Sequence, residues 1–310
     1  MPANETLLFV AFNALIIVLL AIDLGVFHRK NRPVTMREAI LWSVIWIAFS
    51  LLFNLGVLYF AGTTTALEFL AGYLIEKSLS VDNIFVFVLL FSYFGTPASL
   101  QHKVLFWGIL GALVMRSIFI GLGAALIAHF EWILYIFGVI LVVSGWRMFG
   151  EKEMEVHPDK NIVVRLVRKA FPVDGGYESD RFVLMRGGRL HLTQLLLVLL
   201  TVETTDVVFA VDSIPAVFGV TRDPFIVYSS NVCAILGLRS LYFVLAGMMQ
   251  SFAYLSHGLA IILMFIGVKM LIEPWVHISI GLSLAVVGGI LIIAVAASLG
   301  KRWMADPPAS

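Results

Sequence analysis

The sequence predicts an all-α, polytopic helical membrane protein with about nine transmembrane helices. Apolar residues make up 60% of its 310 residues and charged residues only 13%, about half the charged share of a soluble domain. The mean hydropathy is +0.98. The apolar residues gather in runs of the roughly 20 residues that a helix needs to cross a bilayer. A soluble enzyme is therefore excluded, and the net charge of +1 gives no indication of nucleic-acid binding.

Hydropathy places nine runs of membrane length along the chain. The first run is too long for a cleavable signal peptide and no basic segment precedes it, so we expect it to remain as a span. The short alternating segments of a membrane β-barrel are absent from the sequence. The predicted spans cover residues 7–27, 39–61, 67–94, 104–128, 131–149, 191–219, 225–250, 255–272 and 275–299.

Lys and Arg residues predict the orientation of these spans, because cytoplasmic loops are enriched in them. A nine-span count leaves little beyond Arg222 and Lys269 on one side. The N-terminus is therefore predicted outside and the C-terminus in the cytoplasm. The basic residues on the predicted cytoplasmic side are Arg29, Lys30, Arg32, Arg37, Lys103, Lys152, Lys160, Arg165, Arg168, Lys169, Arg181, Arg186, Arg189, Lys301 and Arg302.

The segment at residues 150–190 is the sizeable part of the sequence predicted to lie outside the membrane. Its eight basic residues are nearly matched by seven acidic ones, and two Gly-Gly pairs predict turns within it. We interpret this cytoplasmic loop as a solvated linker between two halves of the protein. A regulatory role is the alternative interpretation.

An internal repeat divides the predicted membrane domain. Residues 76–84 (EKSLSVDNI) in the third span match residues 206–214 (DVVFAVDSI) in the sixth. Two further matches follow in the same order, between Arg116-Ser117 and Arg239-Ser240 and between Gly145 and Gly267. A unit of three spans enters the membrane in the opposite direction the second time. The sequence therefore predicts an inverted three-helix repeat, an architecture of many secondary transporters with the site near the midplane.

The repeat fixes the predicted organisation of the chain, which we take as a single integral membrane domain over residues 1–310. Its parts are peripheral spans one and two (1–66), a first repeat (67–149), the cytoplasmic loop (150–190), a second repeat (191–272) and a final span (275–299).

The third and sixth predicted spans carry five acidic residues: Glu76, Asp82, Glu203, Asp206 and Asp212. One charge at the bilayer centre costs about 2.5–3.5 kcal/mol, so five together cost on the order of 10 kcal/mol. Ionisable residues inside the membrane therefore mark functional sites. We assign a charge-balancing role to the intramembrane bases, and three bases cannot neutralise five acids. Static ion pairs that hold helices together are the alternative. These bases are Lys77, Arg116 and Arg239.

The spacing places some of the polar side chains on common helix faces. At 100° per residue, Glu76 shares a face with Asn83, and Asp206 shares a face with Ser213. The second acid of each motif lies roughly 120° from the first. All of these groups converge on one point only if both spans unwind locally, which Pro215 in the sixth span favours. Two adjacent pockets are the alternative.

Carboxylate, amide and hydroxyl oxygens suit hard cations such as Mg²⁺, Ca²⁺ and Mn²⁺, whereas Zn²⁺ and copper favour nitrogen and sulfur. Closely spaced carboxylates also take up protons, so protons are the expected coupling ion. Asn231 in the seventh span is a further candidate ligand. The predicted metal-binding residues are Glu76, Asp82, Asn83, Glu203, Asp206, Asp212 and Ser213.

Catalytic interpretations find no support in the sequence. A metalloprotease His-Glu-x-x-His pattern, a Walker loop and a Gly-x-Ser-x-Gly elbow are all absent. We therefore expect a protein that is not an enzyme and binds no organic cofactor. The single cysteine, Cys233, excludes an intramolecular disulfide. Gly288 and Gly289 in the last span are predicted to permit close helix contact.

Residues 76–87 and 203–215 together resemble the paired signature of the TerC family, bacterial integral membrane proteins named for tellurium resistance. The resemblance covers nearly the whole chain, including the charged loop. It implies a relation to small-solute exporters built on inverted three-helix repeats, several of them associated with manganese export. It also implies a bacterial inner membrane. The polar motif residues of the family fall on the seven predicted metal-binding residues.

The sequence thus favours a secondary transporter that exports a divalent cation from the cytoplasm, with protons as the coupling ion. Mn²⁺, in preference to Mg²⁺ or Ca²⁺, is implied by the family resemblance. The alternative is a non-transporting membrane factor, tied to tellurite resistance or to assembly, in which the acids form structural ion pairs.

Overall fold

The computed structural model describes residues 3–27, 35–150, 161–177, 180–186, 188–246 and 254–305. Arg29, Lys30 and Arg32, which contribute to the predicted orientation, lie outside these ranges, as do residues 151–160 of the cytoplasmic loop. Each of the nine apolar runs falls on a helix or, for the seventh, on a bent pair of helices. These are α1 (Ala3–Phe27), α2 (Met36–Ala61), α3 (Thr63–Tyr93), α4 (Ala98–His129), α5 (Ile133–Gly150), α7 (Gln194–Phe218), α8 (Pro224–Leu236), α9 (Leu238–Ala246), α10 (Leu255–Ile272) and α11 (Ile280–Ala305).

Five helices of the described chain are long and apolar enough to cross a membrane, or six if α8 and α9 form one span with a 43° bend. The five are α2, α4, α7, α10 and residues 280–298 of α11. Helix α3 has 31 residues but carries Glu76, Lys77 and Asp82 in its interior. The protein is thus an all-α, multi-pass membrane protein, while the count of nine spans and the inverted repeat remain predictions.

Local sequence determines where several of these helices begin. At α2, Thr35 and Glu38 form a capping box in which each side chain accepts a hydrogen bond from the backbone of the other. Gly62 alone connects α2 to α3. Its φ of +89° lies in a region that glycine adopts readily and other residues adopt rarely, so the chain changes direction within one residue. At α8, the Asp223 carboxylate accepts from two backbone N–H groups and Pro224 occupies the first turn.

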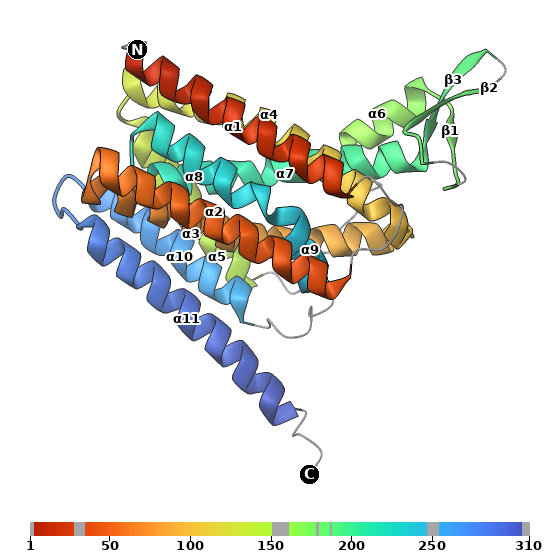
Figure 1. Ribbon diagram of the computed structural model, residues 1–310. Helices are drawn as coiled ribbons and strands as arrows, with labels where there is room; N and C mark the ends of the chain where they lie inside the picture. Colours follow the sequence, from red (N-terminus) through yellow and green to blue (C-terminus); the bar gives the residue numbers. More distant parts are fainter. Residues whose placement is uncertain are drawn as a thin grey trace.

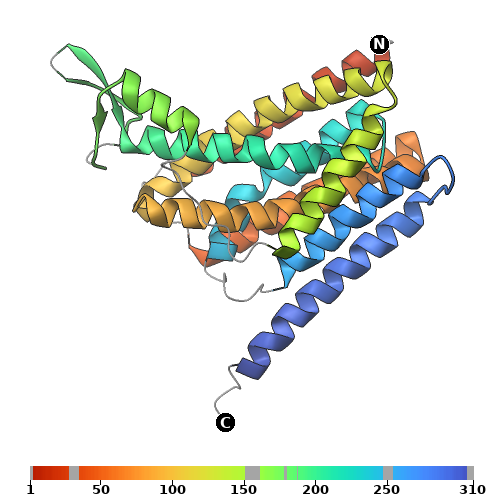
Figure 2. The same ribbon diagram turned by 180° about the vertical axis from the view of Figure 1, so that it is seen from behind.

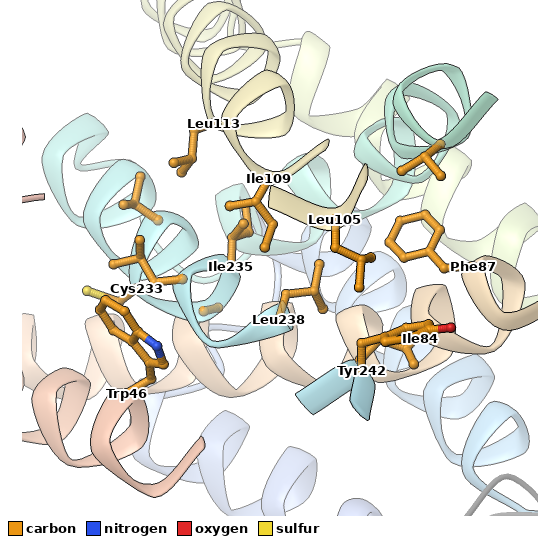
Figure 3. Packing of buried hydrophobic residues seen from close by; sticks show 14 of the residues in the cluster. Trp46, Ile84, Phe87, Leu105, Ile109, Leu113, Cys233, Ile235, Leu238 and Tyr242 are labelled. Atoms are coloured by element: carbon orange, nitrogen blue, oxygen red, sulfur yellow. The ribbon is translucent and has the colours of Figure 1, made fainter. Parts of the chain in front are cut away.

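Helix α3 lies inside the bundle and contacts α2, α7, α8, α9, α10 and α11, whereas α11 runs along one edge (Figures 1 and 2). A large apolar cluster joins α3 to its neighbours, with Trp46, Ile84, Leu105, Ile235 and Leu238 among its buried side chains (Figure 3). In lipid such contacts stabilise by close packing more than by exclusion of water. The packing buries Glu76, Ser80 and Asn83 of α3 within protein.

Helices α5 and α10 approach each other at glycines. A Cβ at Gly267 would lie 2.6 Å from the Gly138 carbonyl oxygen, and one at Gly145 would lie 2.6 Å from the Ala260 carbonyl oxygen. The backbones therefore pack in a way that side chains would prevent. Gly288 and Gly289 do not play this role, because no described neighbouring helix lies within 4 Å of a Cβ there. That prediction is wrong.

The segment at residues 150–190 is folded in its described residues, although the sequence pattern indicated no helix or strand there. It contains helix α6 (Ile162–Ala170) and the strands β1 (Val173–Asp174), β2 (Val183–Arg186) and β3 (Arg189–Thr193). The order is β1-β3-β2, with β1 parallel and β2 antiparallel to β3. Strand β3 includes the first residues of the predicted sixth span, and Thr193 caps α7.

Two contacts fasten the loop to the adjacent ends of α3 and α4. The Tyr177 hydroxyl donates to the Phe94 carbonyl at 2.9 Å. Burial raises the pKa of Tyr177 above its usual value. Lys103 Nζ lies 3.4 Å from the Asp180 carboxylate. The loop therefore has a defined position relative to the bundle.

Candidate functional site

A buried arginine collects the polar groups of both predicted repeats. Arg116 of α4 is 2% exposed. Its Nε and Nη2 donate to the two carboxylate oxygens of Asp206 on α7, at 3.3 and 3.0 Å. Its Nη1 donates to Glu76 on α3. Bidentate pairing with Asp206 fixes the guanidinium plane and joins the two predicted repeats, because Arg116 and Glu76 belong to the first repeat and Asp206 belongs to the second.

Amide and hydroxyl groups complete this cluster. Arg116 Nη1 also donates to Ser213 Oγ at 3.1 Å and to Asn231 Oδ1 at 3.3 Å. Asn231 Nδ2 in turn donates to the second oxygen of Glu76 at 2.9 Å. Two carboxylates therefore face one guanidinium, which leaves an excess of one negative charge when both are ionised. Helices α3, α4, α7 and α8 each contribute to the cluster.

The second acid of each repeat motif lies apart from Arg116. The Ser256 hydroxyl of α10 donates to Asp82 Oδ1 at 2.8 Å. The Ser144 hydroxyl of α5 donates to Asp212 Oδ1 at 2.6 Å. Each aspartate thus binds the third helix of the opposite predicted repeat. Ser144 and Ser256 do not occupy matched positions in the two predicted repeats, so the internal repeat gives no indication of them.

Glu203 occupies a third environment. It lies on α7 in a largely apolar groove of about 540 Å³ between α4 and α7, which Trp107 and Gly111 also line. A Cβ at Gly111 would overlap the Glu203 carboxylate, so the glycine makes room for this side chain. Asp206 lies one turn further along α7. Asn83 is buried on α3 but is not among the groups that hydrogen-bond to Arg116.

Of the two arrangements that the sequence leaves open, local unwinding of the third and sixth spans does not occur, and the acids lie in separate environments. Helices α3 and α7 continue through Asp82 and Asp212, and Pro215 lies inside α7. The break occurs instead at Gly237, between α8 and α9. Lys77 Nζ donates to the Ala234 carbonyl just before this break, at 3.1 Å. A helix interruption inside a membrane requires such partners for its backbone groups.

The structure thus brings together four of the residues predicted for the site and separates the others. Glu76, Asp206 and Ser213 meet at Arg116, whereas Asp82, Asp212 and Glu203 lie in separate environments. Arg239 is buried on α9. Within the described residues, no group of three or more His, Cys, Asp or Glu side chains is arranged to hold a metal ion. The Arg116 guanidinium contacts both Glu76 and Asp206.

The fold and the buried cluster define a multi-pass helical membrane protein with carboxyl groups and a guanidinium in contact in its interior. The chain belongs to the integral membrane protein TerC family, whose family model matches residues 61–305, from the end of α2 to the end of α11.

Among curated relatives, the chain is 48% identical over 296 residues to a protein of Escherichia coli K12 named "Putative membrane-bound redox modulator Alx", covering 93% of this chain and 92% of that one. It is 47% identical over 294 residues to an uncharacterized membrane protein of Myxococcus xanthus (95% and 92% covered). It is 38% identical over 297 residues to one of Rickettsia felis (96% and 99% covered). No solved structure matches the chain.

Proposed function

We propose that this protein is a secondary transporter that exports a divalent cation from the cytoplasm across a bacterial inner membrane. The observation that carries the proposal is the pairing of Glu76 and Asp206, from the two predicted repeats, on Arg116 in the protein interior. Two buried carboxylates with oxygen-bearing neighbours form a site for a hard cation once the guanidinium withdraws. Arg116 then acts as an internal cation that exchanges with the transported one.

This exchange has a physical basis in the cost of buried charge. Leaving two carboxylates without a cation inside a bundle is strongly unfavourable, because each loses its hydration. A bound guanidinium compensates them between transport events, and a divalent ion compensates them more completely. Ser213 and Asn231 supply the further oxygens that a cation needs when it leaves water. Mn²⁺ is the ion that the TerC resemblance favours, and oxygen chemistry alone does not separate it from Mg²⁺ or Ca²⁺.

The contacts between halves support alternating access by two inverted repeats. Gly145 packs against the Ala260 carbonyl, and Gly267 packs against the Gly138 carbonyl. Gly267 is the repeat partner of Gly145, and Ala260 stands at the same offset from Gly138. The two contacts are therefore equivalent under the predicted repeat. Asp82 and Asp212 each bind the opposite half through a single serine hydroxyl. One hydrogen bond is easily broken and remade when the halves move.

Protons are the proposed coupling ion, the N-terminus is proposed outside and the C-terminus in the cytoplasm, and the protein is proposed to have no enzymatic activity. Glu203 lies one turn from Asp206 and borders the groove, so it is the residue through which a proton reaches the cluster. A transport rate independent of pH, with no proton flux during export, would contradict this coupling.

A non-transporting membrane factor is the second candidate, and a specific observation favours it. Arg116 binds both acids in a geometry that a permanent structural ion pair would also have. The name of the Escherichia coli relative suggests a redox role, but the single cysteine of this chain is 1% exposed and has no cysteine to pair with. A redox effect would therefore have to be indirect.

Manganese content of cells distinguishes the two candidates. The wild type, Glu76→Gln and Asp206→Asn are expressed in cells that lack their own manganese exporter, and cell manganese is measured by mass spectrometry after a Mn²⁺ load. A transporter lowers cell manganese, and both variants lose this effect while remaining folded in the membrane. Asp223→Asn is the matched control, because asparagine caps a helix as well as aspartate does.

Asp212→Asn extends this test to the second acid of the motif. In a transporter it abolishes manganese export while the protein still inserts and folds. In a scaffold it either has no effect or destabilises the fold. Unchanged cell manganese on expression of the wild type itself would overturn the proposed function.

A further inference from the structure

Helix α6 of the cytoplasmic loop is sharply amphipathic. Its nine residues read IVVRLVRKA. At 100° per residue, the three basic side chains fall within an arc of about 100°, and apolar side chains occupy the rest of the circumference. The helix has a firm start, because the Asn161 side chain accepts hydrogen bonds from Val163 N and Val164 N at 3.0 and 3.2 Å. The basic residues are Arg165, Arg168 and Lys169.

Only part of the apolar face of α6 packs against protein. Val164 is buried, but Ile162 and Leu166 are 64% and 59% exposed. The three basic residues are also exposed. A solvated linker helix does not gather exposed aliphatic side chains on one side, and a contiguous apolar patch with a polar rim marks a contact surface.

The position of α6 along α7 points to the nature of that contact. Asn161 Nδ2 donates to Thr204 Oγ1 at 2.6 Å. Thr204 lies about 15 Å along α7 from its first residue, at 1.5 Å per residue. Beyond the other end of α6, Asp174 pairs with Thr193 at the start of α7. Helix α6 therefore lies beside the first turns of α7 (Figures 1 and 2), and α7 is apolar enough to cross a membrane.

The two ends of α6 differ in polarity, as do the lipid and the water on either side of a membrane boundary. Ile162 and Val163 stand at the end that lies alongside the apolar length of α7. Arg168 and Lys169 stand at the end near the start of α7, which is where we expect the chain to leave the bilayer. With apolar side chains at the deeper level and basic ones nearer the headgroups, α6 runs across the membrane boundary beside α7, and Lys and Arg at such a helix end extend toward the headgroups.

We propose that α6 crosses the membrane boundary beside α7 and binds anionic phospholipid headgroups through Arg165, Arg168 and Lys169, with Ile162 and Leu166 in contact with the acyl chains. The occupant is the bilayer in which the protein itself sits, so no further partner is required. Positive charge next to a membrane attracts anionic lipids, and the apolar face determines the depth. The hydrogen bond from Asn161 then connects the lipid-bound helix to α7 next to Glu203.

Site-directed spin labelling tests the depth of the helix in the full chain. Leu166→Cys and Met185→Cys are labelled separately and reconstituted in vesicles of phosphatidylcholine and phosphatidylglycerol. Met185 of β2 is 70% exposed and serves as the aqueous control, while Cys233 is too buried to react. The label at position 166 is expected to collide mainly with oxygen, which concentrates in lipid, and the label at 185 mainly with a water-soluble nickel chelate.

Two results at position 166 would overturn the proposal. Access to the nickel chelate equal to that at position 185 would place α6 in water. Shielding from both reagents would show that protein, either another part of the chain or a second copy, covers this face.

Lipid retention tests the basic residues separately. Phosphatidylglycerol that remains bound after detergent purification is quantified for the wild type, Arg165→Gln/Arg168→Gln and the charge-matched control Arg37→Gln/Arg222→Gln, whose two arginines are exposed elsewhere. The α6 pair is expected to lose bound lipid and the control pair to keep it. Equal retention by the two variants would contradict headgroup binding, whether or not the protein transports a cation.

Discussion

Glu76 of α3 and Asp206 of α7 occupy matched positions in the two predicted repeats and bind the same guanidinium, that of Arg116. The pair shows how the bundle retains two carboxylates in its interior. One positive charge compensates part of the cost of two negative ones, and Ser213 and Asn231 add hydrogen bonds. Loss of the guanidinium would therefore leave both carboxylates without their counter-ion.

Arg116→Gln is expected to destabilise the protein by about 3–5 kcal/mol, the usual cost of removing one partner of a buried ion pair. Adding Mn²⁺ is expected to restore part of that loss, because the two acids are then left to the metal. Thermal unfolding in detergent, with and without MnCl₂, measures both effects. Arg222→Gln removes an exposed arginine and should respond to Mn²⁺ no more than the wild type does. A variant that Mn²⁺ does not stabilise would mean that the guanidinium and the metal do not compete.

Gly111→Ala is expected to impair export, because the new methyl group displaces the Glu203 carboxylate from its groove. Gly121→Ala on the same helix is the matched control, since a Cβ there meets nothing within 4 Å. Both changes raise helix propensity by up to about 1 kcal/mol, so only the collision distinguishes them. Manganese efflux from preloaded vesicles measures the difference. Equal efflux by the two variants would show that transport does not depend on the position of the Glu203 carboxylate.

Ser144→Ala and Ser256→Ala each remove the hydroxyl that binds an intramembrane aspartate. A hydrogen bond to a charged group contributes about 1.5–3 kcal/mol, so each variant should unfold at a lower temperature and show altered manganese efflux. Ser117→Ala serves as the control, because Ser117 donates to the Leu113 carbonyl of its own helix. If all three variants behave alike, the contacts between halves do not govern the transport cycle.

Gly267→Ala is expected to destabilise the packing of α5 on α10 by about 1–3 kcal/mol, the usual cost of overpacking. Its Cβ would lie 2.6 Å from the Gly138 carbonyl oxygen, and a backbone atom cannot move aside as a flexible side chain can. Gly288→Ala in α11, where space is open, should be neutral or slightly stabilising. Unfolding midpoints of the two variants in the same detergent decide the matter.

Helix positions and chemical candidates could be predicted from the chain because they depend on local pattern. Apolar runs of membrane length indicate helices directly, and acids within them stand out by their cost. The break at Gly237 was not predicted, because it depends on Lys77 reaching the Ala234 carbonyl from another helix. Ser144 and Ser256 were missed for the same reason. A serine in an apolar run gives no signal until its partner is known.

The secondary structure of the 150–190 loop could not be predicted, for a different reason. Balanced charge and paired glycines predicted a solvated linker, yet β2 and β3 pair as antiparallel strands, and Gly188 just before β3 has a φ of +75°. Short alternating segments of this kind are hard to distinguish from irregular polar chain without knowing what they pack against.

By itself the amino-acid order determined the membrane class, the approximate helix boundaries, the matched acidic motifs and membership of the TerC family. Each of these depends on hydropathy or on the similarity of neighbouring residues along the chain. The tertiary structure decided which acids share a counter-ion and which do not. That outcome depends on how four helices pack, because a carboxylate buried inside the bundle binds whatever donor the packing brings within hydrogen-bond distance.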